Sequence, residues 1–361
     1  MSTTTFKTDN ALTLKLWGKK AFQDSVKDTL FGKLMGSSDR SIVQIKDDLQ
    51  KSAGDRIRFR LRALPQGVGV DGDQTLEGNE EGLSYSHFDL GIDVKRHAHK
   101  VDMLMNQQRV DFNLRSEAKE AQSEFWQEYL DTTFFEYLAG LNKSNGLLDL
   151  TYHNGNTFGN NTLRAPTTGR QFYAGSATSK GTITSSDVMT LTEIDRLVEN
   201  AKLATPTFRK AKFGGKTAYV LVLHPRQVYD LRTNTNQGQW LDIQKAAMQG
   251  GKVSDNPIWG EALGMYNGVI LVEHTRIPTF NNAGSGNNLP GARALFLGAQ
   301  GAVCGFGRET PGASRMKWVE KKFDYDAKFG VSAGLIWGLN KTTFDDVDFG
   351  VMALDTYAAS H

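Results

Sequence analysis

Residues 56–62 read Arg-Ile-Arg-Phe-Arg-Leu-Arg and alternate strictly between a charged and an apolar side chain. Successive side chains of a β-strand point to opposite faces, so this pattern predicts a strand with one apolar face and one cationic face. The cationic face is formed by Arg56, Arg58, Arg60 and Arg62.

A second alternating run, Phe-Asp-Leu-Gly-Ile-Asp-Val-Lys-Arg, occupies residues 88–96, and a glycine-rich acidic stretch at 67–82 separates the two runs. The simplest interpretation is a long two-stranded ribbon over residues 55–103 with a mobile acidic tip. An isolated two-stranded ribbon is only marginally stable in water. The ribbon therefore needs a partner surface, and its four arginines suggest an acidic one.

Residues 113–139 predict one long helix that begins after the N-cap Asn113 and ends at Gly140. At a rise of 1.5 Å per residue, such a helix spans roughly 40 Å. One face is apolar, and the opposite face carries the carboxylates Glu117, Glu120, Glu124, Glu128, Asp131 and Glu136. We therefore expect a rigid spine with an acidic outer face.

The remaining elements are less distinctive. Residues 10–36 predict an amphipathic helix ended by Gly36, and the polar residues 142–186 predict a surface loop or a domain boundary. An α/β pattern follows, and strands return near the end of the chain. The expected elements are a helix over 187–203, buried strands at 217–223, 268–272 and 294–297, and later strands at 316–320, 334–339 and 349–354.

The composition is that of an ordinary soluble globular protein: of the 361 residues, 39% are hydrophobic and 23% are charged. A net charge of +2 does not indicate a nucleic-acid binder driven by bulk charge. The single cysteine, Cys304, cannot form an internal disulfide, and the N-terminus lacks the pattern of a signal peptide. We therefore expect a cytoplasmic protein with no membrane partner.

Three sequence patterns resemble catalytic or ligand-binding motifs, but the residues around each pattern do not fit that function. Residues 67–72 match G-x-G-x-x-G, but an acidic stretch follows where a phosphate-binding helix would have to begin. Ser332 matches G-x-S-x-G, but the residues after it predict a strand instead of the helix of a nucleophile elbow. His97 and His99 are surrounded by Lys95, Arg96 and Lys100, which disfavour a metal ion, so we expect a surface strand there. No catalytic residue, cofactor or metal is expected.

An ordered series of short motifs resembles the major coat proteins of tailed phages with the HK97-type fold, and more narrowly the short-tailed-phage coat protein family. The match spans nearly the whole chain. The motifs are Leu16-Trp17-Gly18-Lys19-Lys20, Gly54-Asp55-Arg56-Ile57, 75–81 (TLEGNEE), Gln108-Arg109-Val110, His224-Pro225, Ala299-Gln300-Gly301-Ala302, 318–325 (WVEKKFDY) and Phe349-Gly350-Val351.

The resemblance implies an α+β, HK97-like capsid fold and a role for each segment. Residues 1–50 would form an N-terminal arm, and 51–105 an extended β-hairpin loop that lies over a neighbouring subunit. Residues 106–186 would form a peripheral domain with the spine helix 113–139. Residues 187–300 would be an α/β axial domain at the capsomer centre, and 301–361 would return as strands of the peripheral domain.

The implied function is that of a major capsid protein, not an enzyme, that self-assembles into hexamers and pentamers of an icosahedral shell around phage double-stranded DNA. Assembly in the host cytoplasm, a portal protein, a separate scaffolding protein, a possible decoration protein and non-specific contact with the packaged DNA follow from the same resemblance. The alternatives are a bacterial nanocompartment shell of the same fold, a serine hydrolase using Ser332 and a nucleic-acid-binding module.

The charge pattern adds a hypothesis about assembly. The arginine-faced ribbon and the acidic spine are complementary, so we expect Arg56, Arg58, Arg60 and Arg62 to face Glu117, Glu120, Glu124 and Glu128 of an adjacent subunit. Exposed ion pairs contribute only about 0–1 kcal/mol each. Affinity must therefore come mainly from apolar burial, while charge selects the partner and the register.

Overall fold

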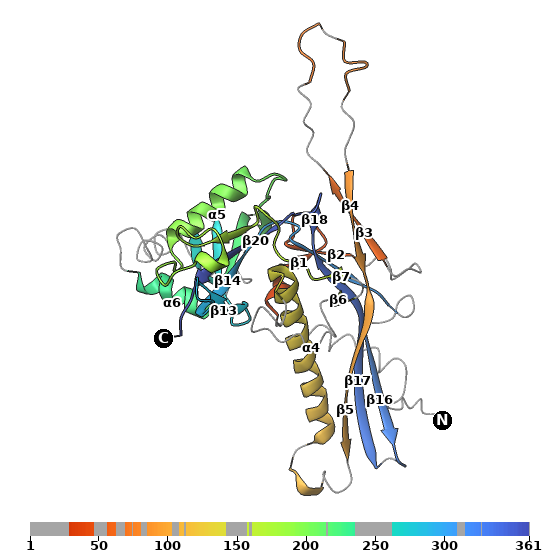
Figure 1. The fold of residues 1–361 in the computed structure, drawn as a ribbon. Helices are drawn as coiled ribbons and strands as arrows, with labels where there is room; N and C mark the ends of the chain where they lie inside the picture. Colours follow the sequence, from red (N-terminus) through yellow and green to blue (C-terminus); the bar gives the residue numbers. More distant parts are fainter. Residues whose placement is uncertain are drawn as a thin grey trace.

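The structure is a computed structural model of the chain. It describes residues 29–46, 56–62, 69–73, 75–80, 85–102, 108–111, 113–141, 157–158, 161–213, 216–234, 262–308, 315–325 and 327–360. Two β-sheets, one long helix and a projecting hairpin make up an elongated α+β molecule (Figure 1). None of the described helices has the length and apolar character needed to cross a membrane.

The first sheet is built from segments that are far apart in the sequence. Its order is β1-β2-β15-β17-β16, and β5 also pairs with β17. The strands are β1 (Met35–Gly36), β2 (Val43–Lys46), β5 (Asp93–Asp102), β15 (Ala302–Phe306), β16 (Met316–Phe323) and β17 (Lys328–Lys341). The 14-residue strand β17 is the axis of this sheet, because β5, β15 and β16 all pair with it.

The second sheet has the order β11-β12-β10-β14-β20-β8, with β13 paired to β14 and β9 paired to β10. Its strands are β8 (Gln171–Tyr173), β9 (Ala211–Phe213), β10 (Lys216–Leu223), β11 (Ala262–Tyr266), β12 (Val269–Glu273), β13 (Thr279–Ala283), β14 (Leu289–Leu297) and β20 (Val351–Tyr357). The helices α5 (Leu191–Leu203) and α6 (Pro225–Thr233) belong to the same lobe, where a separate apolar core contains Leu197 and Leu231.

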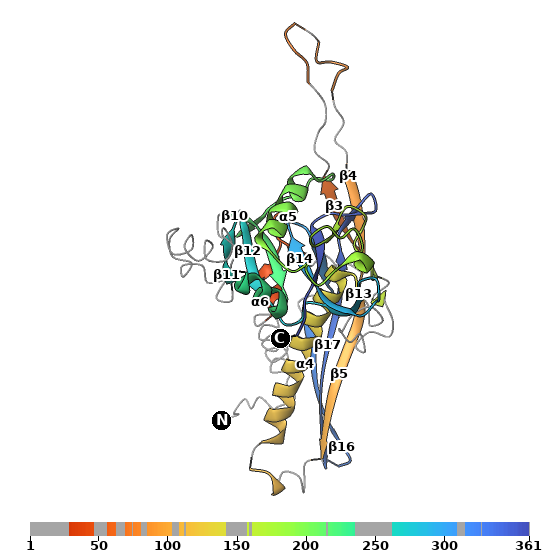
Figure 2. The same cartoon turned by 60° about the vertical axis from the view of Figure 1, so that its left-hand side comes forward.

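The predicted spine helix is α4 (Leu114–Ala139), and both of its ends have hydrogen-bonded caps. The Asn113 side chain accepts hydrogen bonds from the backbone N–H groups of Arg115 and Ser116. At the other end Gly140 adopts a left-handed conformation and donates its N–H to Glu136. The helix lies along β5 and β17 of the first sheet (Figures 1 and 2).

The ribbon is the hairpin of β3 (Arg56–Arg62) and β4 (Tyr85–Gly91), paired from Arg56–Gly91 to Arg62–Tyr85. Short elements complete the fold: the helix α2 (Leu30–Leu34), the 3-10 turn η3 (Lys180–Thr182) and the two-stranded pairs β6 (Thr157–Phe158) with β7 (Asn161–Thr162) and β18 (Thr343–Phe344) with β19 (Val347–Asp348).

Three expectations about element boundaries are wrong. The helix expected over 10–36 does not include Thr29 or reach Gly36, because Thr29 is extended and caps a helix of five residues, after which Met35 and Gly36 enter the first sheet. Residues 10–28 lie outside the described residues. The extended loop expected over 51–105 is too long, because 93–102 pair with β17 along ten residues.

The last correction concerns residues 301–361, expected to return to the peripheral domain. The strands β15, β16 and β17 do belong to the first sheet with α4, but β20 pairs with β14 and β8 in the second sheet. The strand β8, within the expected peripheral segment 106–186, also joins the second sheet. Alternation of side chains predicts a strand but contains no information about which of two sheets will accept it.

Candidate assembly surfaces

The apolar face of the ribbon packs on the chain's own first sheet. Ile57, Phe59 and Leu90 are 0–2% exposed and form one cluster with Val303 of β15. Gly305 permits this close approach, because a Cβ at that position would lie 2.4 Å from the Ile57 Cδ1 atom. The partner surface that the ribbon needs is therefore, at its base, intramolecular.

The arginine face of the ribbon points away from this cluster. Arg56 and Arg58 are exposed, whereas the side chains of Arg60 and Arg62 lie outside the described residues. Arg58 forms a two-point ion pair with Asp89 across the hairpin, with Nε–Oδ1 and Nη2–Oδ2 distances of 2.7 and 2.8 Å. The hydrogen bond from Arg58 lowers the pKa of Asp89.

Sequence reasoning missed this pairing, although a signal for it existed. Asp89 lies between two apolar residues of the second alternating run and therefore shares the charged face of the hairpin. The register that places it opposite Arg58 depends on the turn, which the alternation alone does not define.

Four carboxylates form an exposed line on α4, which we call the acidic stripe: Glu117, Glu120, Glu124 and Glu128. The stripe continues toward the second sheet, where the chain supplies its own cations. Glu128 contacts Arg276 at 3.1 Å, and Asp131 contacts His274 at 3.4 Å. The expectation of an acidic outer face is wrong for Asp131 and Glu136, which are buried because the second half of α4 is enclosed by the rest of the molecule.

The structure does not bring the predicted contact residues together within one chain. Among the described residues, no ion pair joins Arg56 or Arg58 to a glutamate of the acidic stripe. The contact between adjacent subunits that the sequence suggested therefore stays a prediction.

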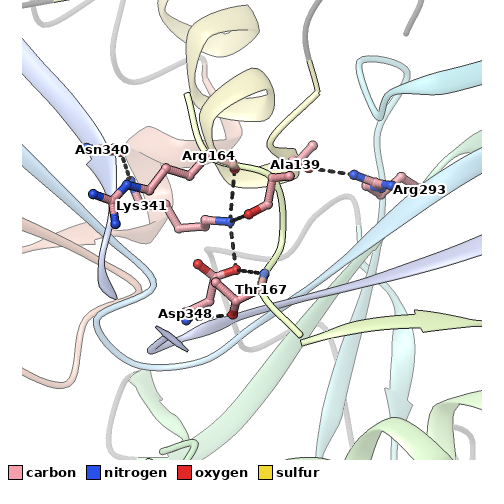
Figure 3. Close-up of polar contacts among 8 residues, drawn as sticks. Ala139, Arg164, Thr167, Arg293, Asn340, Lys341 and Asp348 are labelled. Atoms are coloured by element: carbon pink, nitrogen blue, oxygen red, sulfur yellow. Dashed lines mark hydrogen bonds and ion pairs between the residues drawn. The ribbon is translucent and has the colours of Figure 1, made fainter. Parts of the chain in front are cut away.

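A buried polar junction connects the end of the first sheet to the segment that follows α4 (Figure 3). The Lys341 Nζ atom lies 2.7 Å from an Asp348 oxygen and donates to the carbonyl groups of Arg164 and Ala165. Asp348 also accepts a hydrogen bond from the backbone N–H of Thr167. Burial lowers the pKa of Lys341, and the adjacent carboxylate of Asp348 opposes this shift.

A second buried pair joins the second sheet to the spine. Arg293 of β14 contacts Asp355 of β20 through two hydrogen bonds of 2.6 and 2.7 Å, and its Nη1 atom donates to the carbonyl of Ala139 at 3.0 Å. Ala139 is the last residue of α4. One guanidinium therefore couples two strands of the second sheet to the end of the spine helix.

The residues whose sequence patterns resembled catalytic or metal-binding motifs lie in or beside the strands of the first sheet. Ser332 lies inside β17, paired with Val319 and Ala98, so the strand–turn–helix geometry of a nucleophile elbow is not present. His97 stacks on Phe125 with ring centroids 3.6 Å apart and contacts Gln122. The expected surface strand is thus half-buried against α4 on its histidine face. The described residues contain no group of three or more metal-ligating side chains.

The deciding comparison is with a family model described as phage capsid protein, which matches residues 5–360. The chain belongs to this phage capsid protein family. A curated relative, the major capsid protein of Pseudomonas phage KPP25, is 26% identical over 96% of this chain and 94% of its own length.

Solved capsid structures agree with the family. The capsid protein superimposes on the capsid of Ralstonia phage GP4 with a TM-score of 0.82 and 30% identity, covering 99% of this chain and 96% of that one. The capsid of cyanophage Pam1 gives a TM-score of 0.70 at 22% identity, with 93% and 94% covered. The expected α+β, HK97-like fold and the function of a major capsid protein are confirmed, and the role is structural, in a homo-oligomeric shell of the virion.

Proposed function

We propose that this major capsid protein assembles into hexamers and pentamers that close an icosahedral shell around double-stranded DNA, in the cytoplasm of the host. The observation that carries the proposal is the shape of the molecule: a hairpin whose tip projects far from both sheets, together with a spine whose acidic stripe is exposed (Figure 1). A projecting tip and an exposed row of carboxylates are typical of surfaces that contact another molecule.

The domain roles of the resemblance belong to the same proposal. The second sheet with α5 and α6 would lie at the capsomer centre, and the first sheet with α4 would form the periphery. A portal protein, a separate scaffolding protein and a possible decoration protein would be partners, and contact with the packaged DNA would be non-specific. The nanocompartment alternative is not favoured, because the matching family model describes phage capsid proteins.

We further propose that the arginine face of the ribbon contacts the acidic stripe of an adjacent subunit. Arg58 is already paired with Asp89, so Arg56, Arg60 and Arg62 are the residues to test. Glu128 is already paired with Arg276 of its own chain, so Glu117, Glu120 and Glu124 are the residues of the stripe to test.

Electron microscopy of the purified protein tests the first proposal, with rings, tubes or shells as the expected result. For the contact, Arg56→Glu/Arg60→Glu should reduce the particle yield at least about tenfold, because like charges across an interface are repulsive. The matched control Arg56→Lys/Arg60→Lys keeps the charge and should assemble. Normal particles from the charge-reversed variant would contradict the contact, while circular dichroism verifies that the subunit is folded.

A further inference from the structure

The chain leaves the ribbon and enters the first sheet within a few residues of Gly91. Residues up to Gly91 pair with β3, and residues from Asp93 onward pair with β17. Only Ile92 separates the two pairings, so β4 runs directly into β5 (Figure 1). The angle between the ribbon and the first sheet is therefore decided by the backbone at this junction.

Two glycines cross at the junction. A Cβ added to Gly338 of β17 would lie 2.0 Å from the Gly91 carbonyl oxygen, so the two backbones approach more closely than a side chain would allow. Neither residue has a side chain that could lock the crossing, and a glycine backbone has more conformational freedom than that of any other residue. The crossing by itself therefore leaves the angle of β4 free to vary.

The apolar cluster at the base of the ribbon holds it against the sheet without defining this angle. Ile57, Phe59 and Leu90 pack with Val303 of β15. Hydrophobic attraction is non-directional, whereas a hydrogen bond weakens steeply when its angle departs from linear. The angle at the junction is therefore set by whichever hydrogen bonds the Gly91 backbone makes.

Both polar groups of the Gly91 backbone bond to the side chain of Asn161, a residue of β7. The Asn161 Oδ1 atom accepts a hydrogen bond from the Gly91 N–H at 2.9 Å, and its Nδ2 atom donates to the Gly91 carbonyl at 2.8 Å. Asn161 is 3% exposed, so water does not compete for these bonds. The amide pairs with the ribbon as the backbone of a neighbouring strand would.

Asn161 is itself tied to the spine helix. Its backbone carbonyl accepts a hydrogen bond at 3.0 Å from the hydroxyl group of Tyr137, a buried residue in the last turn of α4. Tyr137 precedes Ala139 by two residues, and Ala139 is the residue that Arg293 contacts. A continuous series of hydrogen bonds therefore connects the end of the spine helix, through Asn161, to the base of the ribbon.

We propose that Asn161 is a positioning residue for assembly: its amide fixes the angle at Gly91 and so aims the ribbon relative to the spine helix. The inference rests on the proposed self-assembly for its purpose, because copies whose ribbons point in different directions cannot repeat the same contact around a closed shell. The angle itself belongs to a single chain and can be measured without assembly.

Double electron–electron resonance between two spin labels measures the spread of this angle. The variant His87→Cys/Leu203→Cys places one label on β4 and the other on α5, both at exposed sites, and Cys304 stays unlabelled because it is buried. Dilution with unlabelled protein restricts the signal to distances within one chain. In this background Asn161→Ala should broaden the distance distribution at least about twofold, because only non-directional packing then holds the ribbon. Thr162→Ala, on the exposed side of the same strand, is the matched control and should leave the distribution unchanged.

Asn161→Asp gives a pH-dependent test of the two-point bond. A protonated carboxyl group donates one hydrogen bond and accepts another, as the amide does, whereas a carboxylate only accepts. Because burial raises the pKa of the introduced carboxyl group, the distribution should match that of the labelled parent at about pH 5 and broaden at about pH 8. A distribution that is equally narrow, or equally broad, at both pH values overturns the proposal. This variant also decides the question if Asn161→Ala does not fold.

Particle assembly separates this inference from the proposed function. Asn161→Ala, without labels, should lower the particle yield at least about fivefold, because misdirected contacts do not close. If the wild-type protein forms no particles, self-assembly fails, and the label distances still decide whether Asn161 aims the ribbon. If the wild-type protein assembles but Asn161→Ala leaves the distances unchanged, or broadens them and still gives particles of normal yield and diameter, the positioning role alone fails.

Discussion

At the residue scale, two buried ion pairs connect segments of this protein that are far apart in the sequence. Lys341 with Asp348 and Arg293 with Asp355 are both almost fully buried. Separating the members of a buried pair leaves an uncompensated charge, which costs about 3–5 kcal/mol. Displacing the second sheet relative to the spine would break the bond from Arg293 to Ala139, so the pair resists relative movement of the lobes.

Gly140 lies close to both buried pairs, because it follows Ala139, which Arg293 contacts, and packs against Arg164, which Lys341 contacts. A Cβ added there would lie 2.1 Å from the Arg164 carbonyl oxygen, the same oxygen that accepts a hydrogen bond from Lys341. The residue also has a positive φ of 60°, which favours glycine.

We predict that Gly140→Ala lowers the free energy of unfolding by more than the ~1–2 kcal/mol expected from the left-handed conformation alone. The matched control is Gly169→Ala, since Gly169 has a φ of 80° but no atom within 4 Å of an added Cβ. Denaturant unfolding of both variants measures the difference. Equal destabilisation would show that the contact with Arg164 is unimportant.

His224 provides a pH-dependent cap for α6. Its Nδ1 atom accepts a hydrogen bond from the backbone N–H of Arg226, which requires a neutral ring. Burial, with a smaller contribution from the charge of Arg226, lowers the pKa of His224 to about 4.

Because the folded-state pKa of His224 lies below its ordinary value of 6.5, the unfolded state binds this proton more readily. The stability contributed by neutral His224 is present above pH 6.5 and is lost as the pH falls toward 4. We predict that the melting temperature of wild type falls more steeply between pH 7 and pH 5 than that of His224→Asn, which keeps a capping acceptor. Parallel pH profiles would contradict this role.

At the element scale, the base and the tip of the ribbon have different surroundings. Its base is held by Ile57, Phe59 and Leu90 on the chain's own sheet, whereas its tip projects from the body. The base therefore behaves as part of the core, and the tip is the part available to another subunit.

We predict that Phe59→Ala, which removes a fully buried ring, destabilises the ribbon by about 3–5 kcal/mol. Hydrogen exchange should accelerate in β3 and β4 while β10 and β12 keep their protection, because the ribbon rests on its own cluster. Arg56→Ala, on the exposed face of the same strand, is the control and should change neither region. Uniform acceleration across both sheets would show that the ribbon is not a separate unit.

At the scale of the whole molecule, the angle between the two lobes is a property that a shell must control. Small differences in subunit shape, repeated around a closed assembly, change its curvature. Arg293 is placed to limit such differences, since it contacts β20 and the end of α4 from β14.

We predict that Arg293→Lys, which keeps the charge but cannot make both contacts, broadens the distribution of particle diameters. Cryo-electron microscopy measures the distribution, and circular dichroism verifies that both sheets are folded. Arg276→Lys, at the exposed contact with Glu128, is the control and should give wild-type particles. An unchanged distribution for Arg293→Lys would remove this residue from the control of shape.

Much of this architecture follows from local patterns in the chain. The alternation at 56–62 and the spacing between Asn113 and Gly140 predict β3 and α4 with nearly correct ends, because strand and helix periodicity and capping are local properties. The exposure of Glu117, Glu120, Glu124 and Glu128 also follows from helical spacing.

The arrangement of these elements required the tertiary structure. Asp131 and Glu136 have the same helical spacing as the exposed glutamates, and only the enclosure of the second half of α4 makes them buried. Residues 93–102 alternate like the ribbon but pair with β17, more than 200 positions away in the sequence. Lys317, Gly334 and Arg96 lie in one row only because β16 and β5 both pair with β17. Periodicity defines which side of an element is apolar, whereas the neighbours it receives depend on long-range pairing that no local pattern encodes.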